Sequence, residues 1–195
     1  MSHYLDETTI QRQENRLFFR RWLKHPVRLG TLAPISVRFS KFAASLLNNP
    51  KKGPIVEIGA GTGRLTRALL AAGVPNDNLI VVELDPELCR FLKESLPSIT
   101  VIEGDARLLT TLLPKEWMGK VSSVVSAIPL MYLEPSERQD IVKACFDVMS
   151  PGGDLMHITY SPKSPLHFNA ALKAERVGQF WLNLPPAFVW RYQSS

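Results

Sequence analysis

The residues best suited to chemistry form one acidic and glycine-rich stretch, Val-Glu-Ile-Gly-Ala-Gly-Thr-Gly, at positions 56–63. A short apolar run precedes it, and residues 64–70 follow with leucines at helical spacing. This order predicts a buried strand, a glycine turn and a helix. Glycines let a ligand approach the bare backbone, and the free N–H groups that open the next helix favour polar or anionic ligands. The stretch is therefore the predicted binding loop.

The spacing of the glycines distinguishes between ligands. A dinucleotide loop has the pattern Gly-x-Gly-x-x-Gly, and counted from Gly59 its third glycine falls at Arg64. The glycines are instead Gly59, Gly61 and Gly63, with Glu57 two residues earlier. This arrangement resembles the E/D-x-G-x-G-x-G motif of the class I S-adenosylmethionine (SAM) methyltransferases, whose loop surrounds the methionine and ribose of SAM. A dinucleotide loop and a glycine turn without a ligand are the alternatives.

Acidic residues follow the next two predicted strands. The first, residues 79–83, ends at Glu83, 24 residues after Gly59. An acid at this place commonly accepts hydrogen bonds from both ribose hydroxyls of a bound nucleotide, so it fits NAD and SAM alike; a solvent-facing acid is the alternative. The second strand, residues 99–103, is followed by Gly-Asp-Ala. The resemblance to methyltransferases implies that Asp105 binds the adenine amino group, and a helix N-cap is the alternative.

The fourth predicted strand, residues 121–126, ends at Ser126 and leads into Ala-Ile-Pro-Leu. In this fold class the carboxyl end of that strand faces the ligand crevice, here the transferred methyl group. Methyltransferases that act on amino groups of bases carry N/D-P-P-Y/F here. The missing carboxamide and aromatic argue against a flipped adenine, which needs an aromatic side chain to stack on. The predicted SAM-binding residues are Glu57, Gly59, Ala60, Gly61, Gly63, Glu83, Leu84, Asp105, Ala106 and Ser126.

The elements that must position these residues alternate between strands and helices. We expect an α/β fold: a doubly wound, Rossmann-like sheet of seven strands, as in class I methyltransferases. Residues 135–149 read as a helix, Gly152-Gly153 as a turn into a fifth strand at 155–160, and residues 175–184 and 188–193 as a final antiparallel pair. Residues 1–50 are expected to add an amphipathic helix and a second helix, 35–47, packed on the core formed by residues 51–195.

Length and composition limit the function classes. The chain has 195 residues, 45% of them hydrophobic, which suits one soluble domain. No apolar run approaches the roughly 18 residues of a spanning helix, and the polar, acidic first residues are unlike a secretory signal. Cys89 and Cys145 each lie in an apolar periodic segment and are expected to be buried thiols. Their spacing predicts no metal site.

Charge is concentrated near the N-terminus. Residues 1–41 hold eight Lys/Arg and three Asp/Glu, a net charge of +5, whereas residues 42–195 hold fifteen of each. This asymmetry indicates a basic segment that meets an anionic surface, either membrane or nucleic acid. Within it, residues 6–25 predict an amphipathic helix with a basic face and an apolar face, formed by Arg12, Arg16, Arg20 and Lys24 and by Phe18, Phe19, Trp22 and Leu23.

A basic face beside an aromatic one is typical of a helix that lies in a membrane interface. The alternative is that the aromatic face packs on the domain and the arginines are solvated. Further segments resemble the soluble bacterial phospholipid N-methyltransferases, which make phosphatidylcholine from phosphatidylethanolamine. The segments that carry this resemblance are 18–26, 30–36, Ser-Ala-Ile-Pro at 126–129, Tyr-Ser-Pro at 160–162 with Ser-Pro at 164–165, and Asn-Leu-Pro-Pro at 183–186 with Trp190 and Tyr192.

The resemblance implies a reaction and its partners. SAM donates up to three methyl groups in succession to one lipid amine and becomes S-adenosylhomocysteine. The enzyme would be cytoplasmic and peripheral at the inner face of the membrane, with an anionic membrane surface and phosphatidylethanolamine as partners. No nucleic acid or protein partner is expected. The ribosomal RNA adenine dimethyltransferases are similar in pattern but carry an extra helical domain after the core, which we do not expect in 195 residues.

Two tyrosines are candidates for the acceptor site. Tyr160, after the fifth strand, and Tyr132, after Pro129, would orient the amine or hold its methylated cation by cation–π contact; tyrosines packed in the core are the alternative. His157 lies inside a strand and is expected to be structural. The residues expected to bind the lipid head group or the membrane are Arg12, Arg16, Phe19, Arg20, Trp22, Lys24, Arg28 and Arg191.

Two rival functions follow from the same residues. One is an RNA or small-molecule amine methyltransferase, in which the basic segment binds phosphates. The other is a non-catalytic, membrane-associated module that keeps the SAM fold. The Ser-Ala-Ile-Pro segment favours the lipid enzyme over the first rival, and the intact set of predicted SAM contacts argues against the second.

Overall fold

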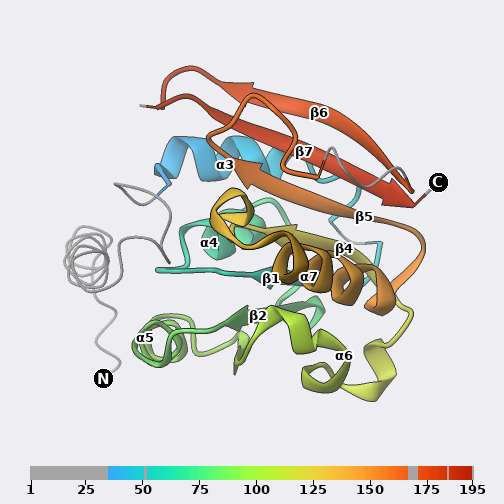
Figure 1. Cartoon of the computed structure of the whole chain (residues 1–195). Coiled ribbons are helices and arrows are strands. Elements are labelled where there is room, and N and C mark those ends of the chain that lie inside the picture. The colour runs from blue at the N-terminus through green and yellow to red at the C-terminus, as the bar shows by residue number, and fades with distance from the viewer. Residues whose placement is uncertain (1–34, 51, 167–170, 184, 195) are drawn as a thin grey trace.

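A computed structural model describes residues 35–50, 52–166, 171–183 and 185–194 (Figure 1). Seven strands form one sheet in the order β3-β2-β1-β4-β5-β7-β6. Strands β1 to β5 are parallel, and β7 is antiparallel to both β5 and β6. The predicted fold class is confirmed. The strands are β1 Ile55–Ile58, β2 Leu79–Glu83, β3 Thr100–Glu103, β4 Val121–Ser126, β5 Met149–Thr159, β6 Leu172–Phe180 and β7 Ala187–Ser194.

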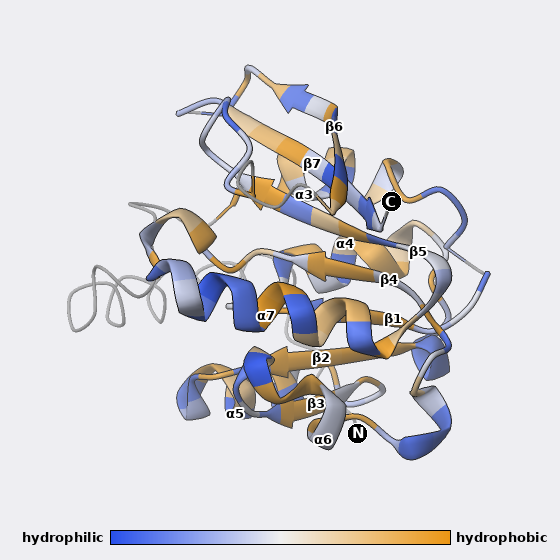
Figure 2. Ribbon diagram, turned by 45° about the vertical axis from the view of Figure 1, so that its right-hand side comes forward, coloured by the Kyte–Doolittle hydropathy of each residue, from blue (hydrophilic) through white to orange (hydrophobic). Residues whose placement is uncertain are grey.

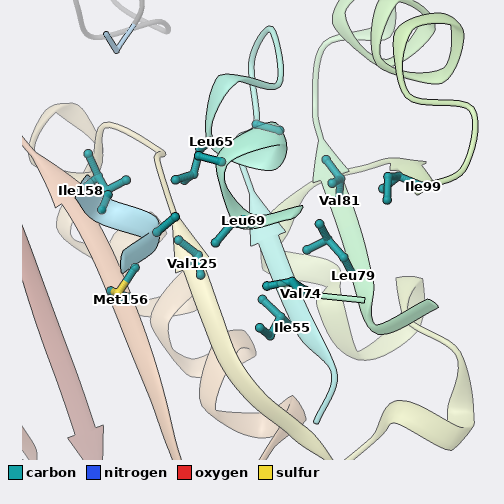
Figure 3. Packing of buried hydrophobic residues seen from close by; sticks show 14 of the residues in the cluster. Ile55, Leu65, Leu69, Val74, Leu79, Val81, Ile99, Val125, Met156 and Ile158 are labelled. Carbon is teal, nitrogen blue, oxygen red and sulfur yellow. The ribbon is translucent and has the colours of Figure 1, made fainter. Parts of the chain in front are cut away.

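Helices cover both faces of the sheet. In Figure 2 the strands between these helices are largely coloured as hydrophobic. The central strands β1 and β2 are buried along their whole length, which explains their continuous apolar sequence. One face packs on α3, α4 and α5 around the residues of Figure 3, and the other packs on α6 and α7. The helices are α3 Val37–Ser45, α4 Arg64–Ala71, α5 Pro86–Ser95, α6 Leu109–Leu112 and α7 Pro135–Val148.

Local sequence explains where the helices begin. The Ser36 hydroxyl accepts a hydrogen bond from the backbone N–H of Phe39 at 3.1 Å and caps α3. Asp85 caps α5 in the same way, and Pro86 occupies the first helical position. Short 3₁₀ turns precede or follow several strands, at η1 Asn76–Asn78, η2 Ala106–Leu108, η3 Lys115–Trp117 and η4 Leu130–Tyr132.

Two predicted boundaries were wrong. Gly152 and Gly153 do not form a turn outside the sheet, because β5 begins at Met149 and contains both. The register between β4 and β5 shifts between Val121 and Ser123, and Gly152 has a φ of 77°, so the glycines form an irregularity within a longer strand. Strand β6 ends at Phe180 rather than at residue 184, which leaves residues 181–186 as the connection to β7.

The N-terminal predictions divide at residue 35. The predicted helix at residues 6–25 lies outside the described residues, together with Arg12, Arg16, Phe19, Arg20, Trp22, Lys24 and Arg28. The second predicted helix is present as α3, which contributes Phe39, Ala43 and Ala44 to the core and contacts α4 and β6. Within the described part of the chain, every helix is too short or too polar to cross a membrane.

Arg191 has a structural partner. Its Nε lies 2.8 Å from Oδ2 of Asp154, both side chains are largely buried, and its Nη2 donates to the carbonyl of Leu46 at 2.6 Å. This placement does not support the expectation that Arg191 binds a lipid phosphate, because the guanidinium already joins β7, β5 and the end of α3. It acts as a buried cross-link of the fold.

Removal of this cross-link should destabilise the protein. Arg191→Met leaves the Asp154 carboxylate buried without its partner, so the free energy of unfolding is expected to fall by about 3–5 kcal/mol. Urea denaturation measures the change. Lys143→Met is the matched control, because it breaks an exposed Lys143–Asp147 pair on α7 and should cost less than about 1 kcal/mol. Equal effects of the two substitutions would contradict a structural role for Arg191.

Candidate active site

The binding loop lies where the strand order reverses. The chain moves outward from β1 to β3 and returns to β4 on the other side of β1, so the carboxyl ends of β1 and β4 form the switch point at which this fold class binds its ligand in a crevice. Gly61 has a φ of 60°, and a Cβ built on it would meet no atom within 4 Å. The backbone at Gly61 is therefore bare on its open side, as a loop that a ligand approaches must be.

Gly59 is needed for a different reason. Its φ is 72°, and an added Cβ would lie 2.7 Å from Cγ1 of Ile128. Ile128 belongs to the Ser-Ala-Ile-Pro segment after β4, so the predicted donor loop and the predicted acceptor loop pack directly against each other. The backbone N–H of Ala127 also donates to the carbonyl of Ile58 at 3.1 Å. Donor and acceptor sides of the crevice are thus one packed unit.

Glu83 joins the glycine loop to β2. Its Oε2 accepts from the backbone N–H of Gly61 at 2.8 Å, and its Oε1 accepts from the N–H of Asp85 at 3.0 Å. Burial raises the pKa of Glu83, and the backbone hydrogen bonds from Asp85 and Gly61 oppose that rise. A carboxylate offers about four acceptor sites, and the backbone N–H of Leu84 also bonds to this one, so Glu83 retains capacity for a ribose hydroxyl.

Glu57 is buried behind the loop. It is fully inaccessible, and Thr66, in the first turn of α4, is the residue that hydrogen-bonds to its carboxyl group. Burial raises the pKa of Glu57 to about 8, against a smaller opposing effect of the Thr66 hydroxyl. The side chain is therefore mainly protonated at pH 7 in the absence of ligand.

Asp105 already has a partner. Its Oδ1 accepts from the Arg107 backbone N–H at 2.9 Å and caps η2, and both oxygens accept from the Arg107 guanidinium. This pairing lowers the pKa of Asp105. The cap predicted as the alternative is therefore present. Bonds from Arg107 occupy both carboxyl oxygens, so an adenine amino group would have to displace or share one of them. Arg107 also lies 3.4 Å from Glu137. The sequence pattern did not predict Arg107 as a partner of Asp105, although its position two residues after that acid is consistent with such a pair.

The remaining predicted SAM contacts differ in exposure. Leu84 is 56% exposed beside Glu83, whereas Ala60 and Ala106 are buried. Ser126 is fully buried, and its hydroxyl lies 3.3 Å from Nδ1 of His157. The Ser126 side chain therefore points into the core, and only its backbone can face the crevice. Burial lowers the pKa of His157 to about 3, so this residue stays neutral at physiological pH and is structural, as expected.

The acceptor candidates lie after β4 and β5. Tyr160 is partly buried, packs against the core cluster under α3 and α4, and is hydrogen-bonded to the side chain of Asn183. Asn183 is held in turn by a bond from its Nδ2 to the carbonyl of Pro185 at 2.9 Å. Tyr132 is 57% exposed in η4. The structure thus joins Tyr160 to the Asn-Leu-Pro-Pro segment, a contact between two loops that the sequence did not predict.

Comparison with known proteins identifies the family. Residues 55–153, about half of the chain, match the family described as "Methyltransferase domain". The chain belongs to the class I SAM-dependent methyltransferases. Its sheet order and antiparallel β7 agree with this assignment. The methyltransferase is 30% identical over 175 residues to an ornithine lipid N-methyltransferase of Singulisphaera acidiphila, with 88% of this chain and 91% of the relative covered.

Other relatives share part of the chain or the fold. A ribosomal RNA small subunit methyltransferase A of a Synechococcus species is 32% identical over 137 residues, covering 62% of this methyltransferase and 44% of the relative. The crystal structure of a magnesium protoporphyrin IX methyltransferase from Synechocystis, solved with SAM, superposes with a TM-score of 0.64 at 14% identity, covering both chains completely. This structural match shows the fold.

The residues present fit SAM. The bare backbone at Gly61 provides room, and the carboxyl group of Glu83 binds that backbone at the end of β2, where this fold class holds ribose. Leu84 supplies an exposed apolar side chain next to Glu83. SAM brings an activated methyl group on a sulfonium, so the protein has to bind, orient and exclude water. The described residues include no cluster of potential metal ligands.

Proposed function

We propose that this methyltransferase transfers methyl groups to the primary amine of a phospholipid head group, with phosphatidylethanolamine as the first candidate and one to three successive transfers. The observation that supports this most is the 30% identity to a lipid N-methyltransferase over 88% of the chain. That relative acts on ornithine lipid, which also presents an amine at a membrane surface. The sequence resemblance described above favours phosphatidylethanolamine.

The acceptor site has to orient the lipid amine, and no residue in it has to act as a base. The lipid amine must lose its proton before its nitrogen attacks the methyl carbon. Burial raises the pKa of Tyr160 above its usual value, so its phenol stays protonated and can only orient the amine by hydrogen bonding. His157 is buried and neutral. We infer that water takes the amine proton before transfer, so the rate should rise with pH as the lipid amine deprotonates.

Tyr160→Phe tests the orienting role. Loss of the hydroxyl removes one hydrogen bond to the amine, so kcat/KM for lipid methylation is expected to fall about tenfold. The bond to Asn183 is also lost, so the melting temperature should fall by about 2–4 °C, while SAM affinity stays near that of the wild type. Tyr192→Phe is the matched control, since Tyr192 is buried and its hydroxyl is hydrogen-bonded to the Ser164 hydroxyl at 2.9 Å; it should change the rate less than about twofold. An unchanged rate for Tyr160→Phe would remove this hydroxyl from the acceptor site.

Methyl transfer itself should be measured with labelled SAM. Purified protein is incubated with vesicles of phosphatidylethanolamine and phosphatidylglycerol, with vesicles that carry ornithine lipid in place of phosphatidylethanolamine, or with ribosomal RNA. The products are separated by chromatography. Label in mono-, di- and trimethylated phosphatidylethanolamine is expected. Label in ornithine lipid alone would contradict phosphatidylethanolamine as the acceptor and would identify the amine of ornithine lipid instead. Label only in RNA, which the partial match to ribosomal RNA methyltransferases makes the second candidate, would overturn it.

We further propose that residues 6–25 bind the enzyme to the cytoplasmic face of an anionic membrane. Arg16→Glu with Arg20→Glu replaces two cations by anions on the basic face, and each cation contributes about 1 kcal/mol at an anionic surface. The double variant is expected to lose sedimentation with anionic vesicles and to keep its affinity for SAM. Sedimentation equal to that of the wild type would show that the anchor lies elsewhere.

A further inference from the structure

Exposed apolar side chains gather at one edge of the sheet. The large hydrophobic residues that are exposed in the described part of the chain are Val37, Leu84, Leu108, Met131, Tyr132, Trp181 and Leu182. Leu84 directly follows β2, Leu108 ends η2 after β3, and η4 after β4 contains Met131 and Tyr132. These four residues therefore lie at the carboxyl edge of the sheet, around the mouth of the SAM crevice.

The other three residues lie at the same edge. Strands β5 and β6 are both antiparallel to β7, so they run in the same direction, and the turn after β6 extends beyond the carboxyl edge with Trp181 and Leu182. Val37 begins α3, and the carbonyl of Ile35 just before it accepts from Nη1 of Arg64 at 3.0 Å, at the start of α4. The amino edge carries none of the seven.

This distribution is informative because single exposed hydrophobic residues are ordinary, whereas a concentration around a site marks a binding surface. Trp181 is 66% and Leu182 80% exposed. Trp181 makes an edge contact with Phe188, with ring centroids 6.4 Å apart, which helps to hold the indole at the tip of the turn. Tryptophan and tyrosine favour the interface between lipid and water, because they are apolar with a polar end.

Charge favours a lipid surface over an apolar protein groove. In residues 160–166 and 181–186, which flank the acceptor side, the charged residue is Lys163, and there is no acid. Residues 1–34, which lead directly into Ile35 at this edge, hold six Lys/Arg and three Asp/Glu. Apolar side chains beside an excess of cations match the composition of surfaces that bind anionic bilayers.

We propose that Trp181 and Leu182, together with Met131 and Tyr132, insert into the interface of an anionic phospholipid bilayer and turn the mouth of the active site toward it. These four residues are called the edge patch. The inference deepens the proposed function and rests on it for the lipid nature of the acceptor. It adds a membrane contact within the methyltransferase core, separate from residues 6–25, and explains how a head group enters the site without leaving the bilayer.

An environment-sensitive fluorophore tests insertion directly. Leu182→Cys is labelled with a nitrobenzoxadiazole group, with Glu116→Cys, at an exposed position on the amino side of β4, as the matched control. The native thiols of Cys89 and Cys145 are buried and unpaired in disulfides, and burial raises the pKa of each, that of Cys89 to about 12. They should therefore stay unlabelled at neutral pH.

Vesicles of phosphatidylethanolamine and phosphatidylglycerol are expected to raise and blue-shift the emission at position 182 about twofold or more, with quenching by nitroxide-labelled lipid, while position 116 is unchanged. Protein that sediments with vesicles without a change at position 182 would overturn the proposal. A failure to sediment at all would also overturn it. Emission already blue-shifted before lipid is added, and insensitive to it, would show that residues 1–34 or another copy cover the patch instead.

Methylation rates on vesicle lipid and on a monomeric lipid separate the role of the edge patch from that of the catalytic site. Trp181→Ser with Leu182→Ser is expected to lower methylation of vesicle lipid about tenfold or more, and to leave methylation of monomeric dihexanoyl phosphatidylethanolamine within about twofold of the wild type. Lys115→Ser with Glu116→Ser is the control on the opposite edge. Equal losses on both substrates would overturn the inference. Insertion at position 182 without methylation of any lipid would support membrane insertion of the edge patch and would refute only the proposed lipid methylation.

Discussion

Glu83→Ala is expected to weaken SAM binding by about 100-fold or more without unfolding the protein. The substitution removes the acceptor for the ribose hydroxyls, and hydrogen bonds to a charged group each contribute about 1.5–3 kcal/mol. It also leaves the backbone N–H groups of Gly61 and Asp85 without the carboxylate that holds them, so the glycine loop loses its link to β2. Isothermal titration calorimetry with SAM measures the change.

A neighbouring acid provides the control. Glu103 pairs in register with Glu83 at the end of β3 and is exposed, so Glu103→Ala alters the charge at the same edge without touching the loop. Its SAM affinity should stay within about threefold of the wild type. If Glu83→Ala binds SAM as tightly as Glu103→Ala does, Glu83 is not part of the cofactor site.

Glu57→Gln is expected to stabilise the ligand-free protein at pH 8 by several kcal/mol and to change it little at pH 5. The pKa of Glu57 is raised to about 8 in the folded protein from 4.5. Between these two pH values the folded state keeps a proton that the unfolded chain has released, so the free energy of unfolding of the wild type falls as pH rises. Glutamine has a similar shape, carries no charge and removes this dependence.

Urea denaturation at pH 5 and pH 8 without SAM measures both free energies. Glu116→Gln, on the exposed η3 turn, replaces a solvated acid and should leave the pH dependence as it is in the wild type. Parallel pH profiles for Glu57→Gln and the wild type would contradict a buried, protonated Glu57. The two experiments on Glu83 and Glu57 together separate the acid that binds the cofactor from the acid that limits stability.

Much of the fold could be predicted because parallel strands are read from local composition. The fourth predicted strand coincides with β4, Val121–Ser126, since buried parallel strands give short continuous apolar runs between polar turns. The glycine loop was equally clear, because a positive φ strongly favours glycine. The family's final antiparallel pair was placed correctly in order, although β6 begins and ends earlier than its side-chain pattern suggested.

Contacts between residues that lie far apart in the sequence could not be predicted. Arg191 was assigned by charge to a phosphate, and its bond to Leu46 spans 145 positions of sequence. The contact between Tyr160 and Asn183 depends on two loops that meet only after β6 and β7 are formed. Gly152 and Gly153 have turn composition, yet their pairing with β4 extends the strand across them. Local patterns do not encode such partners.

The contact between Gly59 and Ile128 has an evolutionary consequence. Because a Cβ on Gly59 would collide with Ile128, any change in shape after β4 is felt by the loop that binds the donor. The β6–β7 hairpin is separated from β1 by β4 and β5. Selection for a new acceptor should therefore place its first substitutions in the hairpin, and diversification within the lineage is expected to spare residues 126–129.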